Sequence, residues 1–172
     1  MMKNTIALAG ALVGVLAAPL AHAQWTPDRS LQLSVAAGSA ERMPGQWWFP
    51  AAQWGLGWRP FHEFAVEAVA QGIFSIEDGG GDGRLAYHGF YGLRGIGYLP
   101  LTPGLDATAS LGAGRAQLHP DGDVHTTFQR DDVMLGAGLM WNLRPSYSLG
   151  FEFQRLVRTS ANTAMVRMEW HL

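Results

Sequence analysis

The chain contains no cysteine, and its only lysine, Lys3, stands near the N-terminus. The absence of cysteine excludes disulfide bonds and thiolate metal sites. Charged residues make up only 15% of the chain, whereas hydrophobic residues reach 48%. No apolar run after Ala23 approaches the roughly 20 residues that a membrane-spanning helix needs. Basic charge is not in excess either. Without Lys3, 11 arginines face 14 acidic residues, a formal net charge of −3 that predicts no nucleic-acid partner.

The first 23 residues predict a cleaved secretory signal peptide. Lys3 gives a basic start, residues 6–20 form an apolar run, and Ala21-His22-Ala23 provides a small-residue cleavage site. The run is about 15 residues long, too short for a transmembrane helix. Residues 24–172 are then expected to form one domain of a mature, exported protein.

Alternating polarity is the main pattern in what remains, and residues 163–172 show it most clearly. The even-numbered positions of this segment are apolar and the odd-numbered positions are mostly polar, as in a strand with two different faces. An apolar final strand with a free edge would invite aggregation. The segment is therefore expected to pair with the first strand, around residues 31–37, and so to close a barrel.

The same pattern predicts eight strands in all. They cover residues 30–38, 49–58, 64–74, 85–98, 105–118, 132–143, 147–157 and 163–172, with the fourth the least regular. Tight, proline-bearing turns are expected after the second, fourth and sixth strands. They are placed at residues 59–61, 99–103 and 144–146, against longer polar loops at 39–48, 75–84 and 119–131.

Alternation alone does not say which face is inside, because a soluble lipocalin-like barrel has the same period. Three features favour a membrane barrel with a polar interior. The polar faces are rich in Gly, Ser, Thr and Gln rather than in charge. Short turns alternate with long loops, and aromatic residues gather at strand ends, as in interfacial girdles. The expected girdle residues are Trp47, Trp48, Trp58, Phe61, Tyr98, Trp141, Tyr147 and Trp170.

Four glycine-rich segments carry a family resemblance: Leu93-Arg-Gly-Ile-Gly-Tyr98 and residues 105–114, 136–141 and 149–154. They resemble the second half of the OmpA/OmpX-type eight-stranded outer-membrane barrel. The resemblance implies an all-β, antiparallel, up-and-down transmembrane β-barrel in the bacterial outer membrane, with interior ion pairs at Glu67 and Glu152. The final residue is Leu172, where that family usually has Phe. The peptidoglycan-binding function that OmpA carries beyond its barrel is not expected here.

Charged side chains that face the barrel interior must be paired, because burying an unpaired charge is costly. Strand parity turns Glu67, Glu152, Arg167 and Glu169 inward. A turn over residues 158–161 would place Glu152 directly opposite Arg167, a geometry suited to a bidentate ion pair.

Arg94 is ambiguous by parity. If it shared a face with Ile96 and Tyr98 it would point to lipid, at a cost of roughly 2–4 kcal/mol near the midplane. Counting back through the loop near residue 80 brings it within one residue of opposing Glu67. We therefore expect a bulge at Gly95 that turns Arg94 inward to pair with Glu67.

No catalytic or metal-binding residue and no cofactor is predicted. His125-Thr126-Thr127 lacks the His-x-Ser pattern of lipid A deacylases. The aspartates at 78, 82, 121 and 123 do not fit calcium-loop spacing. An enzyme acting on lipid A and a narrow pore for small solutes remain as alternatives to a structural or surface-interaction role.

The expected partners are outer-membrane lipid and lipopolysaccharide, which the first loop could contact through Arg42, Trp47 and Trp48, and the barrel assembly machinery. We expect a monomer.

Overall fold

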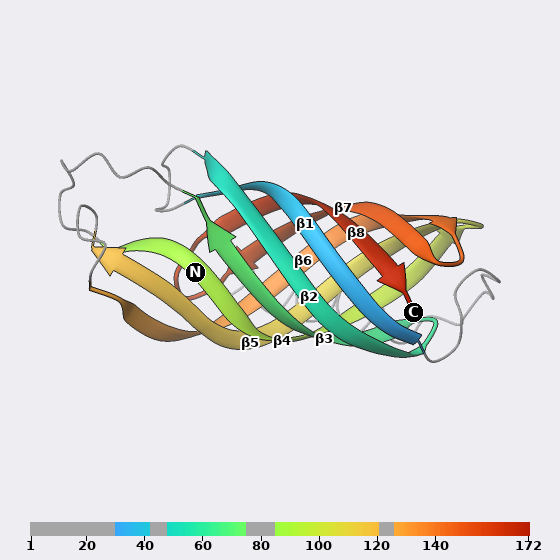
Figure 1. Ribbon diagram of the computed structural model, residues 1–172, viewed down its shortest axis with the longest axis horizontal. Helices are drawn as coiled ribbons and strands as arrows, with labels where there is room; N and C mark the ends of the chain where they lie inside the picture. Colours follow the sequence, from blue (N-terminus) through green and yellow to red (C-terminus); the bar gives the residue numbers. More distant parts are fainter. Residues whose placement is uncertain (1–29, 42–47, 75–84, 121–125) are drawn as a thin grey trace, which may run out of the picture.

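Eight antiparallel strands close into a barrel in the computed structural model, which describes residues 30–41, 48–74, 85–120 and 126–172 (Figure 1). The strands are β1 (Ser30–Glu41), β2 (Trp48–Phe61), β3 (Phe64–Ile73), β4 (Leu85–Thr102), β5 (Leu105–Pro120), β6 (Phe128–Arg144), β7 (Tyr147–Leu156) and β8 (Asn162–His171). Each strand pairs with its neighbours in sequence, so the predicted up-and-down barrel is confirmed. No helix within these described ranges is long and apolar enough to cross a membrane.

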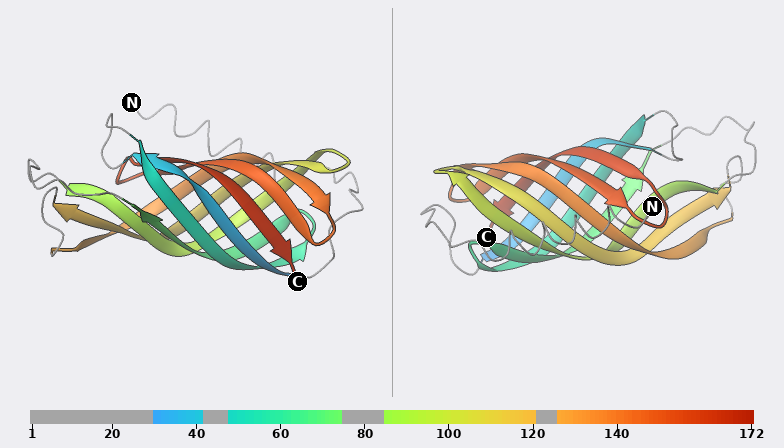
Figure 2. Two further views of the ribbon diagram at one scale, coloured as in Figure 1. Left: turned by 45° about the horizontal axis from the view of Figure 1, so that its top comes forward. Right: turned by 180° about the vertical axis from the view of Figure 1, so that it is seen from behind.

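The barrel closes between β1 and β8, as the C-terminal pattern predicts. The two strands pair from Gln32 opposite His171 to Ala40 opposite Thr163, and the Leu172 amide donates to the Leu31 carbonyl at 2.9 Å. The views in Figure 2 show the tilted strands wrapping around one axis without a gap at this seam. A closed barrel leaves no unpaired strand edge, so the apolar strand β8 offers no free edge for aggregation.

The three short turns and the C-terminus lie at one end of the barrel, here the turn end, and the strand ends that border the longer connections lie at the other, here the loop end (Figure 1). Two of the three turns fall later than predicted. β2 continues through Pro60 and turns at residues 62–63, while β4 continues through Pro100 and turns at 103–104. Both prolines lie where the register shifts, and a bulge is one of the few places where a strand accepts proline. Gly104 has φ of 96°, a conformation that strains any residue with a side chain.

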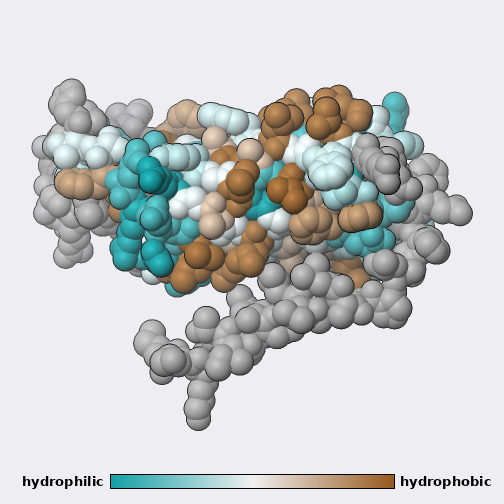
Figure 3. Space-filling model, turned by 90° about the horizontal axis from the view of Figure 1, so that it is seen from below, coloured by the Kyte–Doolittle hydropathy of each residue, from teal (hydrophilic) through white to brown (hydrophobic). Residues whose placement is uncertain are grey.

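The outer wall is apolar and the inner wall is largely polar. Large hydrophobic side chains point outward on every strand, for example Leu56 at 59% and Leu93 at 61% exposed. Figure 3 shows these hydrophobic residues over the middle of the barrel and hydrophilic residues gathered towards its ends. The opposite distribution would hold for a soluble barrel, so the polarity matches that of membrane barrels.

Candidate functional site: the ion-pair network inside the barrel

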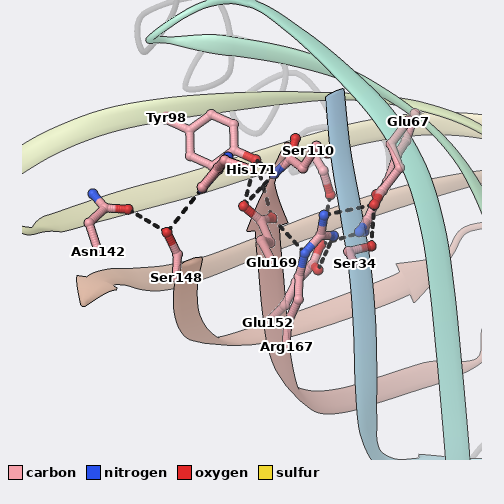
Figure 4. A network of polar contacts seen from close by, with 12 residues as sticks. Ser34, Glu67, Tyr98, Ser110, Asn142, Ser148, Glu152, Arg167, Glu169 and His171 are labelled. Carbon is pink, nitrogen blue, oxygen red and sulfur yellow. Dashed lines mark hydrogen bonds and ion pairs between the residues drawn. The ribbon is translucent and has the colours of Figure 1, made fainter. Parts of the chain in front are cut away.

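The five charged residues assigned to the interior meet in one network. Glu67 lies on β3, Arg94 on β4, Glu152 on β7, and Arg167 and Glu169 on β8, and none is more than 6% exposed. Figure 4 shows the side chains of Glu67, Glu152, Arg167 and Glu169 pointing towards one another inside the barrel. Three carboxylates and two guanidinium groups therefore interlock strands that are far apart in sequence.

Arg94 bridges two of the carboxylates. Its Nε lies 2.6 Å from Glu67 Oε2, and its Nη1 lies 2.7 Å from Glu152 Oε1. Glu67 and Arg94 stand directly opposite each other on β3 and β4, so the inward pairing follows from register. These contacts tie β4 to its neighbour β3 and, across the lumen, to β7.

The expected cause of that inward orientation was wrong. The β3–β4 register runs without a shift past Gly95, so there is no bulge at that position. Arg94 points inward because the even-numbered residues in this part of β4 face the interior. Ile96 and Tyr98 are also buried, each 3% exposed, while Leu93 faces outward. The fourth strand was misread because two bulky, largely apolar residues share the inner face with an arginine.

Arg167 completes the network with three contacts. Its Nη2 lies 2.9 Å from Glu67 Oε1, its Nη1 lies 3.3 Å from Glu152 Oε2, and its Nε lies 2.7 Å from Glu169 Oε1. The predicted direct opposition of Glu152 and Arg167 is wrong. Arg167 faces Gly150, and Glu152 faces Met165. The ion pair forms along a diagonal instead, which long side chains can span.

Neutral groups donate further hydrogen bonds to the three carboxylates. Ser34 donates to Glu67, and Ser110 donates to Glu152 at 3.1 Å. Glu169 accepts from Gln32 and from the Tyr98 hydroxyl. Because a half-satisfied buried network is costly, these neutral donors stabilise the arrangement.

Inward glycines leave the space that the carboxylates occupy. A Cβ at Gly55 would lie 2.1 Å from Glu67 Oε1, and one at Gly136 would lie 2.8 Å from Glu152 Oε1. Those distances are shorter than van der Waals contact, so neither position accepts a side chain unless the carboxylate moves. The glycine-rich polar faces of the sequence are thus part of the site.

Tyr98 was wrongly assigned to the interfacial girdle. It lies inside the barrel beside Glu169, with the Arg59 guanidinium 3.9 Å from its ring centroid. Arg59 itself was missed because it was placed in a turn. It continues the odd-numbered inner face of β2 and is 2% exposed. The signal was present, since Gln53, Gly55 and Gly57 have the same parity.

The other girdle residues within the described ranges face outward. Trp48, Trp58, Phe61 and Trp141 are 42–62% exposed, and Tyr147 and Trp170 are partly exposed. Trp47 lies outside the described residues.

A hydrogen-bonded chain links four polar residues near the turn end. His171 Nε2 lies 3.3 Å from Ser148 Oγ, Ser148 donates to Asn142 Oδ1 at 2.8 Å, and Asn142 donates to Asp106 at 2.9 Å. Nucleophilic catalysis would require the serine to donate to the histidine and a third group to orient the ring. Here the serine donates to Asn142, and His171 Nδ1 has no partner among the described atoms. The chain ties β5, β6, β7 and β8 together.

The loop positions considered for catalysis or calcium lie mostly outside the described residues. These are His125 and the aspartates at 78, 82, 121 and 123. Arg42 of the first loop, which was expected to contact lipopolysaccharide, also lies outside the described residues. Thr127 is described, and its hydroxyl lies 3.5 Å from His119 Nε2. Among the described residues, no group of three or more His, Asp or Glu side chains is placed to hold a metal ion.

A closed barrel of eight strands, with an apolar outer wall and an ion-pair network inside, is the architecture of small transmembrane β-barrels. Similar solved structures include the N-terminal β-barrel domain of Pseudomonas aeruginosa OprF, with a TM-score of 0.59 and 12% identity over 84% of this chain and 100% of that chain. The Neisserial surface protein A matches with a TM-score of 0.55, and Ail, the attachment invasion locus protein of Yersinia pestis, with 0.52. Each of these two is 12% identical over 84% of this chain and 97% of its own.

These likenesses confirm the fold predicted from the OmpA/OmpX resemblance. None of the three names is that of an enzyme. No protein-family model and no curated protein matches the chain.

Proposed function

We propose that the protein is a monomeric outer-membrane barrel of a Gram-negative bacterium, with a structural or surface-interaction role and no enzymatic activity. The observation that carries this proposal is the filling of the lumen in two successive layers. The ion-pair network forms one layer, and a mixed layer forms the other, towards the loop end, where Phe90, Met134 and Met165 lie with the buried amides of Gln53, Gln71 and Gln154. With the interior filled, the outer wall and the loop end are left as the surfaces that meet other molecules.

The architecture is tested by fractionation. The protein is expected in the outer-membrane fraction, with a gel mobility that changes on heating because a folded barrel resists detergent until it is boiled. Recovery as a soluble periplasmic protein would contradict the proposal.

The narrow-pore alternative has one observation in its favour. The side-chain amides of Gln53 and Gln154 are buried, at 1% and 2% exposed, and have no hydrogen-bond partner among the described atoms. Buried polar groups of this kind are usually satisfied by water. Planar-bilayer recordings separate the two functions: a filled lumen predicts no discrete conductance steps, whereas a polar path predicts them.

The enzyme alternative is an activity on lipid A. Mass spectrometry of lipid A after overexpression is expected to show the same species as in cells that lack the protein. A new deacylated or acylated species would overturn the non-enzymatic role.

Exposed arginines at the loop end support a contact with lipopolysaccharide. Arg115, Arg130, Arg155 and Arg158 lie on neighbouring strands β5, β6 and β7 and on the turn after β7, and all are exposed. Asp131 is the exposed carboxylate among them, 3.4 Å from Arg115 Nε, so positive charge is in excess on this part of the described surface. Guanidinium groups bind phosphates with matched, bidentate geometry.

Substituting arginines at the two ends of the barrel tests this contact. The variant Arg115→Gln/Arg155→Gln/Arg158→Gln is expected to bind lipopolysaccharide vesicles more weakly, at roughly 1 kcal/mol for each arginine and less at high salt. Arg144→Gln is the control, because Arg144 is equally exposed but lies at the turn end. Equal weakening by Arg144→Gln would show that net charge alone decides binding.

The folding partner is the barrel assembly machinery of the outer membrane. The support for it is β8, whose alternating faces and apolar end resemble the C-terminal signature that outer-membrane barrels share. Depletion of that machinery should reduce the heat-modifiable form.

A further inference from the structure

Two histidine rings from neighbouring strands meet near the loop end of the barrel. His88 lies on β4 at the register shift between Tyr87 and Gly89, and His119 lies on β5 opposite Ala86. Their ring centroids are 4.3 Å apart, and the ring planes are inclined by 49°. Both side chains are only partly buried. The bulge at His88 is what re-aims its side chain towards the other ring.

His119 has a nitrogen that the rest of the described protein does not satisfy. Its Nε2 faces Thr127 Oγ1 at 3.5 Å, at the limit of a hydrogen bond. Its Nδ1 is shielded from solvent and has no hydrogen-bond partner among the described atoms. A dry, unpaired imidazole nitrogen costs free energy, and a ligand that coordinates it would remove that cost.

We propose that His88 and His119 together bind one divalent transition-metal ion, with water in the remaining coordination positions. Imidazole suits Zn²⁺, Ni²⁺ and Cu²⁺, and Cu²⁺ binds most tightly in the usual order of affinities. Metal–nitrogen bonds are about 2.0–2.1 Å long, so two nitrogens bound side by side on one ion lie about 3 Å apart. Ring centroids 4.3 Å apart place the two imidazoles close enough for one ion to lie between a nitrogen of each.

The site differs from a closed structural metal site. With two protein ligands and no third His, Asp or Glu among the described residues, the ion stays exchangeable and open to water. Its two ligands come from adjacent strands, so a bound ion would clasp β4 to β5 across the bulge. It lies apart from the ion-pair network and does not depend on the proposed membrane role.

The test uses the untagged full chain folded in detergent micelles and titrated with Cu²⁺, followed by calorimetry and electron paramagnetic resonance. The expected result is one tight equivalent whose spectrum shows two nitrogen ligands. His88→Ala and His119→Ala should each weaken binding by about tenfold or more. His62→Ala is the matched control, because His62 lies in the turn between β2 and β3 at the opposite end of the barrel, and it should leave the affinity unchanged.

Retained folding is checked for each variant by heat-modifiable mobility. His119→Gln, which keeps a polar side chain at the position, should also lose the second nitrogen from the spectrum. Absence of a tight equivalent in the unaltered protein would overturn the proposal. So would an affinity in His88→Ala or His119→Ala that matches the unaltered protein.

Discussion

Replacing Arg94 with leucine is the sharpest test of the interior network. Arg94 is 1% exposed, and its contacts of 2.6 and 2.7 Å hold Glu67 and Glu152. Removing one partner of a buried ion pair typically costs about 3–5 kcal/mol, because the other charge stays buried without compensation. Arg167 still contacts both carboxylates in the variant, at 2.9 and 3.3 Å, so the lower end of that range is expected.

A loss of about 3 kcal/mol corresponds to a more than hundredfold change in the folding equilibrium constant. With a denaturant dependence of about 1–3 kcal/mol per molar urea, the unfolding midpoint should fall by roughly 1–3 M. The assay is reversible urea unfolding in phospholipid vesicles, followed by tryptophan fluorescence and by gel mobility. An unchanged midpoint for Arg94→Leu would refute the reasoning.

Two further variants separate charge from packing in that experiment. Arg144→Leu removes an exposed arginine at the turn end and should stay within about 0.5 kcal/mol of the unaltered protein. Glu67→Gln combined with Arg94→Leu removes one buried charge of each sign. This pair should be more stable than the sum of the two single changes predicts, since residues in one network are coupled. Simple additivity would mean that Arg94 acts through its volume alone.

Three other predictions use the same unfolding assay. Gly136→Ala places a Cβ 2.8 Å from Glu152 Oε1 and should cost about 1–3 kcal/mol, whereas Gly72→Ala, with nothing within 4 Å, should be neutral; equal effects would remove the steric argument. Asp132→Ala deletes a carboxylate that accepts three backbone N–H groups at 2.7–2.8 Å, and should lower stability by about 1–3 kcal/mol and speed amide exchange at residues 157–159. Leu139→Arg puts charge on the outer wall and should cost up to about 2–4 kcal/mol in vesicles, while unaltered stability would indicate that this face does not meet lipid.

The strand count, the closure of the barrel and its inside-out polarity could be predicted because each rests on a repeat of two residues. Any error of one residue would turn a strand's whole apolar set to the wrong face. A strand whose face is assigned wrongly is therefore recognised from the other residues of the same strand. Turn positions have no such protection: Pro60 and Pro100 are strong turn signals, yet here they lie in strands, at bulges.

The composition of the candidate site was accessible from sequence, but its geometry was not. Inward parity identified Glu67, Glu152, Arg167 and Glu169, because a buried charge needs a partner. The diagonal pairing of Glu152 with Arg167 depends on where the β7–β8 turn is centred, because moving the centre by one residue shifts the register by two positions. Tyr98 was misplaced because an aromatic ring near a strand end fits an interface as well as an interior, and Arg59 was missed because the neighbouring Pro60 indicated a turn.

The mixed inner wall follows from the size of the barrel. Eight strands leave a lumen just wide enough to be filled by side chains, so large residues must point inward whatever their polarity. In this protein the filling changes along the axis: beyond Glu67, β3 turns Val69, Gln71 and Ile73 inward towards the loop end, and β4 runs from Phe90 to Arg94 away from it.

That order bears on conduction. An ion that passed the network would next meet a mixed wall, in which bulky apolar side chains such as Phe90 and Met134 fill the lumen beside the amides of Gln53 and Gln154. Rearranging the ion pairs alone therefore does not open a path. A conducting state requires the bulky side chains around Phe90 to move as well, which close packing in a closed barrel opposes.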